Sequence, residues 1–129
     1  MIALSKRILV TEFDRNTTRI LCSCIQAAGF EMILALDGDT AWELIQARMP
    51  ILVLMEATLP GLSSLEIVRR VRRSNQIAEL PVMILGDPVS TEEMVEWFKL
   101  GIDEYISKPF STQLLVAQMR AIIRRVHGR

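Results

Sequence analysis

This 129-residue sequence contains one histidine, His127, which lies near the C-terminal end. A single terminal histidine cannot complete a Ser-His-Asp or Cys-His catalytic set. The sequence also has no G-x-G-x-x-G pattern and no glycine-rich phosphate loop. These absences argue against a small α/β enzyme and against a nucleotide-binding protein.

Cysteine is nearly as scarce, with only Cys22 and Cys24, which are two residues apart and too close to staple a fold. No further Cys or His cluster is present to complete a metal site. Cys24 falls on the apolar face of an expected helix, where a free cysteine behaves as a small hydrophobic residue. We therefore expect a reduced, cytoplasmic protein without a structural metal.

Long hydrophobic runs and an excess of one charge are also missing. The longest apolar runs, such as residues 51–55, are far below the ~20 residues that a membrane helix needs. Residues 1–6 contain no stretch resembling a signal peptide. Fifteen basic and fifteen acidic residues balance, so the composition predicts no direct binding of nucleic acid or membrane.

Short apolar segments alternate regularly with amphipathic ones. The expected strands are residues 8–11, 31–35, 51–55, 82–85 and 105–107. The expected helices are residues 15–28, 39–49, 63–73, 91–100 and 111–126, with Asp39, Ser63 and Ser111 as N-caps. This alternation predicts an α/β fold, a doubly wound five-stranded parallel sheet flanked by five helices. We expect one domain over residues 1–125, followed by a tail or the start of a linker over residues 126–129.

In such sheets, sites form at the carboxyl ends of the strands, where the strand order reverses. Glu12 and Asp14 follow the first expected strand, Glu56 follows the third, and Lys108 follows the fifth. Carboxylates hold Mg²⁺ and a lysine can bind a phosphate, so this edge is a candidate cation or phosphate site. The alternative is that these are ordinary solvated charges at loop ends.

Five segments, in order and over nearly the whole chain, carry a resemblance to a known family. They are ILVTE (8–12), PILVLME (50–56), LPG (59–61), PVMIL (81–85) and DEYISKPF (103–110). Together they resemble the receiver (CheY-like) domain of two-component response regulators, which has the flavodoxin-like fold. The last segment and the basic final helix are most similar to the OmpR/PhoB class.

The resemblance implies a phospho-acceptor site that this chain matches only in part. Receivers carry an acidic pair that holds Mg²⁺, and here Glu12 matches the first acid while Phe13 replaces the second. Glu56 stands where receivers have the aspartate that accepts the phosphoryl group. Gly86 stands where receivers have a Thr or Ser that bonds the phosphoryl oxygen. Lys108 matches the lysine of the family.

Two further features of the resemblance concern switching. Tyr105 matches the aromatic switch residue, and Lys108-Pro109 matches a peptide bond that is typically cis in the family. We expect Glu56 to form a salt bridge with Lys108, and Gly86 to leave space for Tyr105 to turn inward. The domain would then be fixed in one state that resembles the active one; the alternative is a drifted, inactive site that imitates nothing.

These departures predict an atypical receiver, a pseudo-receiver, that regulates by protein contacts and not by phosphorylation. No catalytic residue, cofactor or metal is expected, and the chain is not expected to be an enzyme. Phe13 offers no oxygen ligand to Mg²⁺, and Glu56 is one methylene longer than aspartate. The alternative is a phosphorylatable receiver in a phosphorelay, with Glu56 as acceptor and a weak Mg²⁺ held by Glu12 and Glu56.

The resemblance also implies a surface for a protein partner or a homodimer, formed by the fourth helix, fifth strand and fifth helix. We assign to it Met94, Trp97, Phe98, Asp103, Glu104, Leu114, Gln118 and Arg125. Exposed Met, Trp and Phe together favour a buried contact. The alternative is that Val95 and Phe98 face the core, with Met94 and Trp97 half-covered. A C-terminal output domain outside this chain is a further expected partner.

Overall fold

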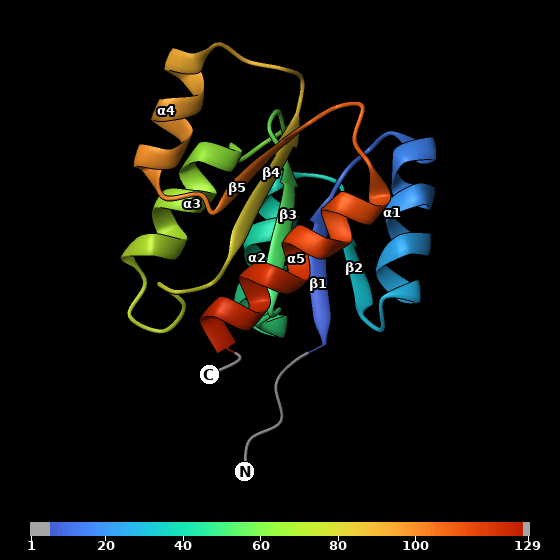
Figure 1. Ribbon diagram of the computed structural model, residues 1–129. Coiled ribbons are helices and arrows are strands. Elements are labelled where there is room, and N and C mark those ends of the chain that lie inside the picture. Colours follow the sequence, from blue (N-terminus) through green and yellow to red (C-terminus); the bar gives the residue numbers. More distant parts are fainter. Residues whose placement is uncertain (1–5, 128–129) are drawn as a thin grey trace.

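The computed structural model describes residues 6–127, and for His127 the backbone alone. Strands and helices alternate through this range (Figure 1). Their bounds are β1 (Arg7–Thr11), α1 (Arg15–Ala27), β2 (Glu31–Ala35), α2 (Gly38–Arg48), β3 (Leu52–Glu56), α3 (Ser64–Arg73), β4 (Val82–Gly86), α4 (Thr91–Leu100), β5 (Glu104–Ser107) and α5 (Thr112–His127). The predicted fold class is confirmed.

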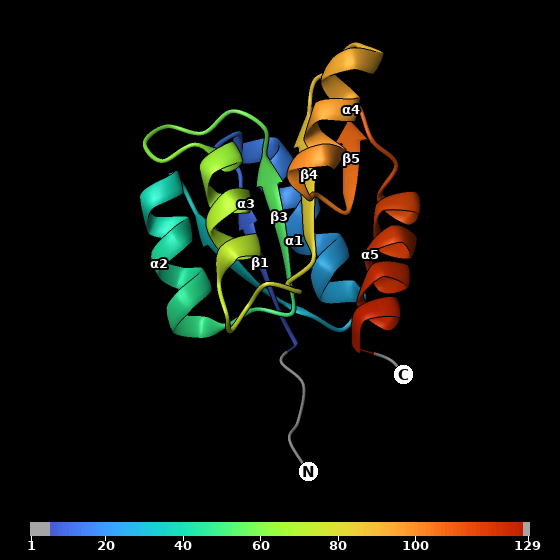
Figure 2. The same cartoon turned by 90° about the vertical axis from the view of Figure 1, so that its left-hand side faces the viewer.

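The five strands form one parallel sheet in the order β2-β1-β3-β4-β5. Helices α1 and α5 lie on one face, and α2, α3 and α4 lie on the other (Figures 1 and 2). The strand order reverses at β1, whose neighbours β2 and β3 follow it on opposite sides. The carboxyl ends of β1 and β3 therefore lie beside each other, where a ligand site of this fold is expected.

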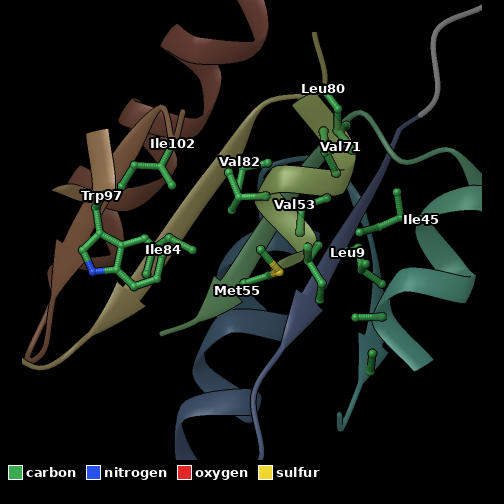
Figure 3. Close-up of a cluster of buried hydrophobic side chains, with 14 of the residues drawn as sticks. Leu9, Ile45, Val53, Met55, Val71, Leu80, Val82, Ile84, Trp97 and Ile102 are labelled. Atoms are coloured by element: carbon green, nitrogen blue, oxygen red, sulfur yellow. The ribbon is translucent and has the colours of Figure 1, made fainter. Parts of the chain in front are cut away.

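The core consists of two apolar clusters, one on each face of the sheet. Leu9 and Val53 belong to the cluster beneath α2, α3 and α4 (Figure 3), whereas Ile8 and Leu52 belong to the cluster beneath α1 and α5. Successive strand residues point to opposite faces, so a strand covered on both sides is apolar throughout. Each fully buried aliphatic side chain contributes roughly 1.5–3 kcal/mol, so the clusters dominate the stability of the domain.

The start of α2 differs from the sequence prediction. The helix begins at Gly38, and its N-cap is Asp37, whose side chain accepts a hydrogen bond from the Thr40 N–H at 2.7 Å. Asp39, predicted as the cap, lies in the first turn and accepts from the Leu62 N–H at 3.2 Å. Gly38 lies inside the helix, and a Cβ atom there would be 1.7 Å from the Leu62 carbonyl oxygen, so only glycine fits at this position.

The other helix ends lie close to their predicted positions. Ser63 caps α3 by accepting from the Glu66 N–H at 3.1 Å, and the Ser111 hydroxyl accepts from the Leu114 N–H at 3.2 Å at the start of α5. α5 continues to His127 and so includes the first two residues of the predicted tail. The remaining tail residues, 128–129, and residues 1–5 of the predicted domain lie outside the described part of the chain.

Two smaller expectations concern the cysteines and the membrane. Cys22 and Cys24 are both free thiols, and Cys24 packs partly buried against the cluster beneath α1 and α5. Burial raises the pKa of the Cys24 thiol, as expected for an unreactive packing residue. Between residues 6 and 127, no helix combines the length and the apolar character that crossing a bilayer requires.

Candidate functional site

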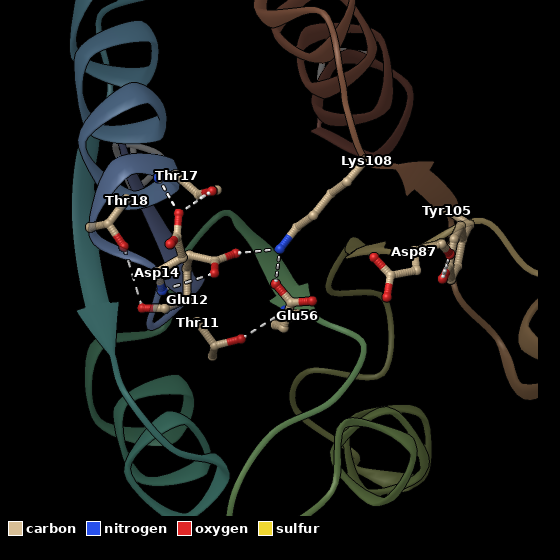
Figure 4. A network of polar contacts seen from close by, with 9 residues as sticks. All are labelled: Thr11, Glu12, Asp14, Thr17, Thr18, Glu56, Asp87, Tyr105 and Lys108. Atoms are coloured by element: carbon tan, nitrogen blue, oxygen red, sulfur yellow. Dashed lines mark hydrogen bonds and ion pairs between the residues drawn. The ribbon is translucent and has the colours of Figure 1, made fainter.

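Glu12, Glu56 and Lys108 come together at the carboxyl edge of the sheet (Figure 4). Glu12 follows β1, Glu56 is the last residue of β3, and Lys108 follows β5. The Lys108 ammonium lies 2.6 Å from Glu56 Oε2 and 3.3 Å from Glu12 Oε1, so it bridges the two carboxylates. The salt bridge expected between Glu56 and Lys108 is therefore present.

The bridge is largely withdrawn from water. The side chains of Glu12 and Glu56 are 2% and 12% exposed, and that of Lys108 is 27% exposed. Charges are attracted more strongly here than at the surface, but each carries a larger desolvation cost. The three groups therefore depend on one another, since removing one leaves its neighbours buried without compensation.

The electrostatics of the bridge centre on a carboxyl that resists ionisation. Burial and the neighbouring Glu12 raise the pKa of Glu56 from 4.5 to about 7, although the hydrogen bond from Lys108 acts in the opposite direction. Burial also lowers the pKa of Lys108, but its contacts with Glu56 and Glu12 raise it by more, so the net direction is upward. Near neutral pH, Lys108 is charged while Glu56 exchanges a proton.

Backbone contacts hold the strand ends that carry these side chains. The N–H of Glu56 donates to Thr11 Oγ1 at 2.9 Å, which ties the end of β3 to the end of β1. The N–H of Lys108 donates to the Gly86 carbonyl at 2.8 Å, and the Lys108–Pro109 peptide bond is cis, as the resemblance implied. Ser64 Oγ donates to the Ala57 carbonyl at 2.7 Å and holds the loop after β3. The site is thus anchored to three strands.

Two of the predicted site residues, Phe13 and Asp14, do not place their side chains in the bridge. Phe13 is 57% exposed, so its ring occupies the surface beside the site. Asp14 caps α1 and accepts from the Thr17 N–H at 2.9 Å and from its hydroxyl at 2.7 Å. These hydrogen bonds lower the pKa of Asp14 and keep its carboxylate ionised. The first turn of α1 thus takes up the side chain of Asp14, while its N–H donates to Glu12 Oε2 at 3.1 Å, so Asp14 borders the site through its backbone.

The donor set does not fit a magnesium ion. Mg²⁺ prefers six oxygen ligands in a near-octahedral arrangement. Here the Lys108 ammonium lies between the two carboxylates that would supply them, Phe13 supplies none, and Asp14 is engaged at the helix end. Within residues 6–127, no group of three or more acidic, histidine or cysteine side chains is arranged to hold a metal.

Gly86 and Tyr105 form the second part of the site. Tyr105 is buried, and its hydroxyl donates to the Asp87 carbonyl at 2.6 Å. A Cβ atom on Gly86 would lie 2.7 Å from the Tyr105 hydroxyl oxygen and 2.8 Å from the Ala57 Cβ, closer than packed atoms approach. The inward position of Tyr105 therefore requires a glycine at position 86. The space expected beside Gly86 is present and filled.

The predicted dimer surface is only partly exposed. Trp97 is buried, 6% exposed, with its ring 6.0 Å from that of Tyr105, so its assignment to this surface is wrong. Val95 and Phe98 are 45% and 43% exposed, so the alternative that they face the core is also wrong. Both Met94–Trp97 and Val95–Phe98 are apolar pairs at helical spacing, and Tyr105 provides a packing site for the indole of Trp97.

The remaining residues of the predicted dimer surface differ in their exposure and in their contacts within the chain. Leu114 is 57% exposed, Met94 is half-buried, and Glu104 is partly exposed. Asp103 contacts Arg72 at 2.9 Å and Arg125 at 4.0 Å within the same chain. Gln118 has a buried side-chain oxygen without a hydrogen-bond partner among the described residues. Phe98 and Leu114 are thus the largest apolar groups that this surface exposes.

Arg72 is a structural residue that the sequence analysis missed. Its guanidinium donates to the carbonyls of Gly101, Ala78 and Leu80 and to the carboxylate of Asp103, and Asp103 also accepts from the Val82 N–H at 2.8 Å. The network joins α3, β4 and the loop before β5. Arg72 is one of three arginines in the last turn of α3, with Arg70 and Arg73, and its spacing alone does not distinguish it from them.

Comparison with known proteins agrees with this architecture. Residues 8–120 match the model of the response regulator receiver domain. The chain is 32% identical over 123 residues to the phosphate regulon transcriptional regulatory protein PhoB of Escherichia coli (strain K12), covering 95% of this chain and 54% of that protein. It is 35% identical to PhoB of Rhizobium meliloti (strain 1021), covering 92% of this chain and 52% of that protein. The chain thus spans about half the length of these relatives.

Solved structures give the same result. A putative response regulator from Chloroflexus aurantiacus superposes with a TM-score of 0.87 at 26% identity, covering 94% of this chain and 99% of that one. The receiver domain of the Francisella response regulator 1452 superposes with a TM-score of 0.84 at 27% identity, covering 92% and 97%. With most of its length matched in both sequence and structure, this chain belongs to the response regulator receiver domain family.

Proposed function

We propose that this receiver domain acts in two-component signalling through protein contacts, without accepting a phosphoryl group. One observation carries the proposal: the Lys108 ammonium lies between the carboxylates of Glu56 and Glu12, at 2.6 and 3.3 Å. The place where the family binds its ion and phosphoryl group is filled by an ion pair of the chain itself. An incoming cation or phosphate has to break this bridge.

The identity of the side chains supports the same proposal. Phe13 brings no ligand for an ion, and charge on a transferring phosphoryl group is then poorly neutralised. The extra methylene of Glu56 displaces its carboxylate by about 1.5 Å, the length of a C–C bond. Misplacement by about 1 Å can cost on the order of a hundredfold in rate. Gly86 provides no hydroxyl for the phosphoryl oxygen.

According to this proposal, the domain is fixed in one arrangement, which resembles the active one. A carboxylate on Lys108 imitates part of the charge of an aspartyl phosphate. Tyr105 is turned inward, and its hydroxyl is held by the Asp87 carbonyl at 2.6 Å. Both features support an arrangement that resembles the active one.

The partner surface on this proposal is formed by α4, β5 and α5, where Phe98 and Leu114 are exposed. It would accept a protein partner or a second copy of the domain. The relatives named above are transcriptional regulatory proteins, and this chain matches about half the length of each. We therefore include an output domain, joined beyond α5, among the expected partners.

Backbone amide NMR tests the proposal most directly. The chain is titrated with Mg²⁺ and then with Mg²⁺ plus beryllofluoride, a mimic of the phosphoryl group. The matched control is the double variant Phe13→Asp/Glu56→Asp, which restores two acids of the family. Phe13 is exposed and the Asp side chain is shorter than that of Glu56, so both substitutions fit the site.

We expect the amides of Glu12, Glu56, Gly86 and Lys108 in the native chain to stay unchanged at millimolar Mg²⁺, and those of the double variant to shift. If the native amides shift together with Tyr105 and α5, the proposal is wrong. The chain is then a phosphorylatable receiver with Glu56 as acceptor and Mg²⁺ held by Glu12 and Glu56. Mass spectrometry after incubation with acetyl phosphate distinguishes the same two outcomes, by addition of a phosphoryl group or by its absence.

A further inference from the structure

Strand β2 is an unprotected edge of the sheet. It is the outermost strand on the α1 side (Figure 1), and after its first residue, Glu31, no charged side chain follows until Asp37. Leu34 and Leu36 are 38% and 57% exposed. Proteins commonly protect such edges from pairing with charges, prolines or bulges. Between Glu31 and Asp37 the sequence contains no charged residue and no proline.

The opposite edge of the same sheet is protected. β5 begins with Glu104, and Asp103 immediately before it is paired with Arg72 at 2.9 Å and with Arg125 at 4.0 Å. A strand approaching β5 would meet these charges. β2 also begins with a paired acid, Glu31 with Arg7 at 3.5 Å, but the five residues after Glu31 are all apolar, whereas in β5 the polar Ser107 follows after Tyr105 and Ile106.

The backbone of β2 offers hydrogen-bonding groups in a defined pattern. The Glu31 N–H points inward and donates to the Lys6 carbonyl at 2.8 Å. Because successive N–H groups of a strand point to opposite sides, Met32 and Leu34 direct their N–H and C=O groups away from the sheet. In an antiparallel pair, residues that point outward in this way exchange two hydrogen bonds with the residue opposite.

We propose that β2 pairs with β2 of a second copy of this chain, antiparallel about a two-fold axis at Ile33, to form one sheet across both copies. Met32 then lies opposite Leu34 of the partner copy, and Leu34 opposite its Met32, so every outward group of these two residues is bonded. Ile33 faces Ile33 as a pair without hydrogen bonds. The interface is isologous, as in most symmetric dimers.

Charge selects this register over the next one. With the axis at Ile33, Glu31 lies opposite Ala35 of the partner copy. With the axis at Leu34, the hydrogen-bonding groups also match, but Glu31 then lies opposite Asp37 of the partner copy. Like charges directly opposite one another on paired strands are destabilising. The axis at Ile33 is therefore the favoured one of the two registers, although the ion pair of Glu31 with Arg7, at 3.5 Å, weakens the repulsion in the other.

The side chains along this edge are also matched. Leu34 is in register with Val10, which belongs to the cluster beneath α1 and α5, so Met32 and Leu34 project on that face. An axis perpendicular to the sheet keeps both copies of α1 on that face. Leu34 is 38% exposed on that face. Pairing thus covers apolar groups that are exposed in the single chain.

Light scattering after size exclusion tests the pairing. The native chain is expected to have twice the mass of one chain, and Leu34→Lys the mass of one. The matched control is Val95→Lys on α4, where the native side chain is 45% exposed, and it should keep the doubled mass. A native chain of single mass at its highest soluble concentration overturns the proposal. So does a doubled mass that Val95→Lys abolishes and Leu34→Lys leaves intact.

Disulfide trapping tests the register. Under mild oxidation, Ile33→Cys is expected to give a covalent dimer, because residues facing each other without hydrogen bonds lie about 4.5 Å apart at Cα, within the range for a disulfide. Leu34→Cys should link far less, and the native chain, with Cys22 and Cys24 alone, gives the background. Linking through Leu34→Cys and not through Ile33→Cys overturns the register, and the mass measurement stands even if Ile33→Cys fails to fold.

Discussion

Removal of the Lys108 charge is the perturbation that tests the site most directly. Lys108→Met keeps the apolar part of the side chain and leaves Glu56 and Glu12 facing each other without a cation. At an effective dielectric constant of about 20, unit charges at 2.6 Å and 3.3 Å attract each other by about 6 and 5 kcal/mol. Desolvation of the three groups offsets most of this, and breaking a buried pair typically costs about 3–5 kcal/mol.

We expect Lys108→Met to lower the free energy of unfolding by about 3 kcal/mol at pH 8 and by about half as much at pH 5. The loss is smaller at pH 5 because the pKa of Glu56, already about 7 in the native chain, rises further once the cation is gone. A protonated Glu56 then donates a hydrogen bond to Glu12 in place of Lys108. Urea unfolding followed by tryptophan fluorescence measures both values.

A double-mutant cycle separates this interaction from general damage to the fold. Glu56→Gln, Lys108→Met and the double variant are unfolded under the same conditions, and the coupling energy is expected to be about 2 kcal/mol at pH 8. Equal losses at pH 5 and pH 8, or a coupling energy below about 0.5 kcal/mol, would falsify the assignment of Lys108 as the cation that holds the two carboxylates together.

Three further predictions follow from other contacts. The free energy of unfolding of the native chain should fall by up to about 3 kcal/mol as the pH rises from 4.5 to 7, because the pKa of Glu56 is raised from 4.5 to about 7. Between these pH values the folded state binds a proton that the unfolded state has lost. In urea unfolding at several pH values, Glu56→Gln should flatten this slope. Gly86→Thr should lower the free energy of unfolding by about 2 kcal/mol by displacing the Tyr105 hydroxyl. The same substitution should cost less when it is made in the Tyr105→Ala variant and compared with that variant in the same unfolding assay. Arg72→Met should lower the thermal midpoint through a loss of about 3 kcal/mol, whereas Arg73→Met, at an exposed position, should stay within about 0.5 kcal/mol of the native chain.

The fold was predictable because its strands are covered on both faces. Residues 52–55 and 82–85 are apolar without interruption, and only a parallel sheet between two helical layers buries such strands completely. In that architecture every strand ends at the same edge, so the contact between Glu56 and Lys108 follows from their positions at two strand ends. The contact required no knowledge of the loops.

Features that depend on packing between distant segments were not predictable in this way. Asp37 and Asp39 are equally good caps in the sequence, but Asp39 instead accepts from the Leu62 N–H. The sequence does not indicate which face of α4 is buried, because Met94–Trp97 and Val95–Phe98 are both apolar pairs that a core could bury. Trp97 is buried because its ring packs against the ring of Tyr105. Each of these outcomes is determined by a residue more than seven positions away in the sequence.

The residues at positions 56 and 86 each fit a neighbour of their own, Lys108 and Tyr105. A threonine at position 86 conflicts with an inward Tyr105, because a Cβ atom there would lie 2.7 Å from the hydroxyl oxygen. An aspartate at position 56 shortens the arm that reaches Lys108, now 2.6 Å from Glu56 Oε2.

Lys108 is in turn attached through its N–H to the Gly86 carbonyl, beside the residue that admits Tyr105. That bond runs through the backbone and forms with any residue at position 86, so a dependence between positions 56 and 86, where the site is kept as a unit, acts through the side chains of Lys108 and Tyr105. Restoring the family residues one at a time should therefore cost more stability than restoring them together. That non-additivity distinguishes an arrangement maintained as a unit from a site that has merely decayed.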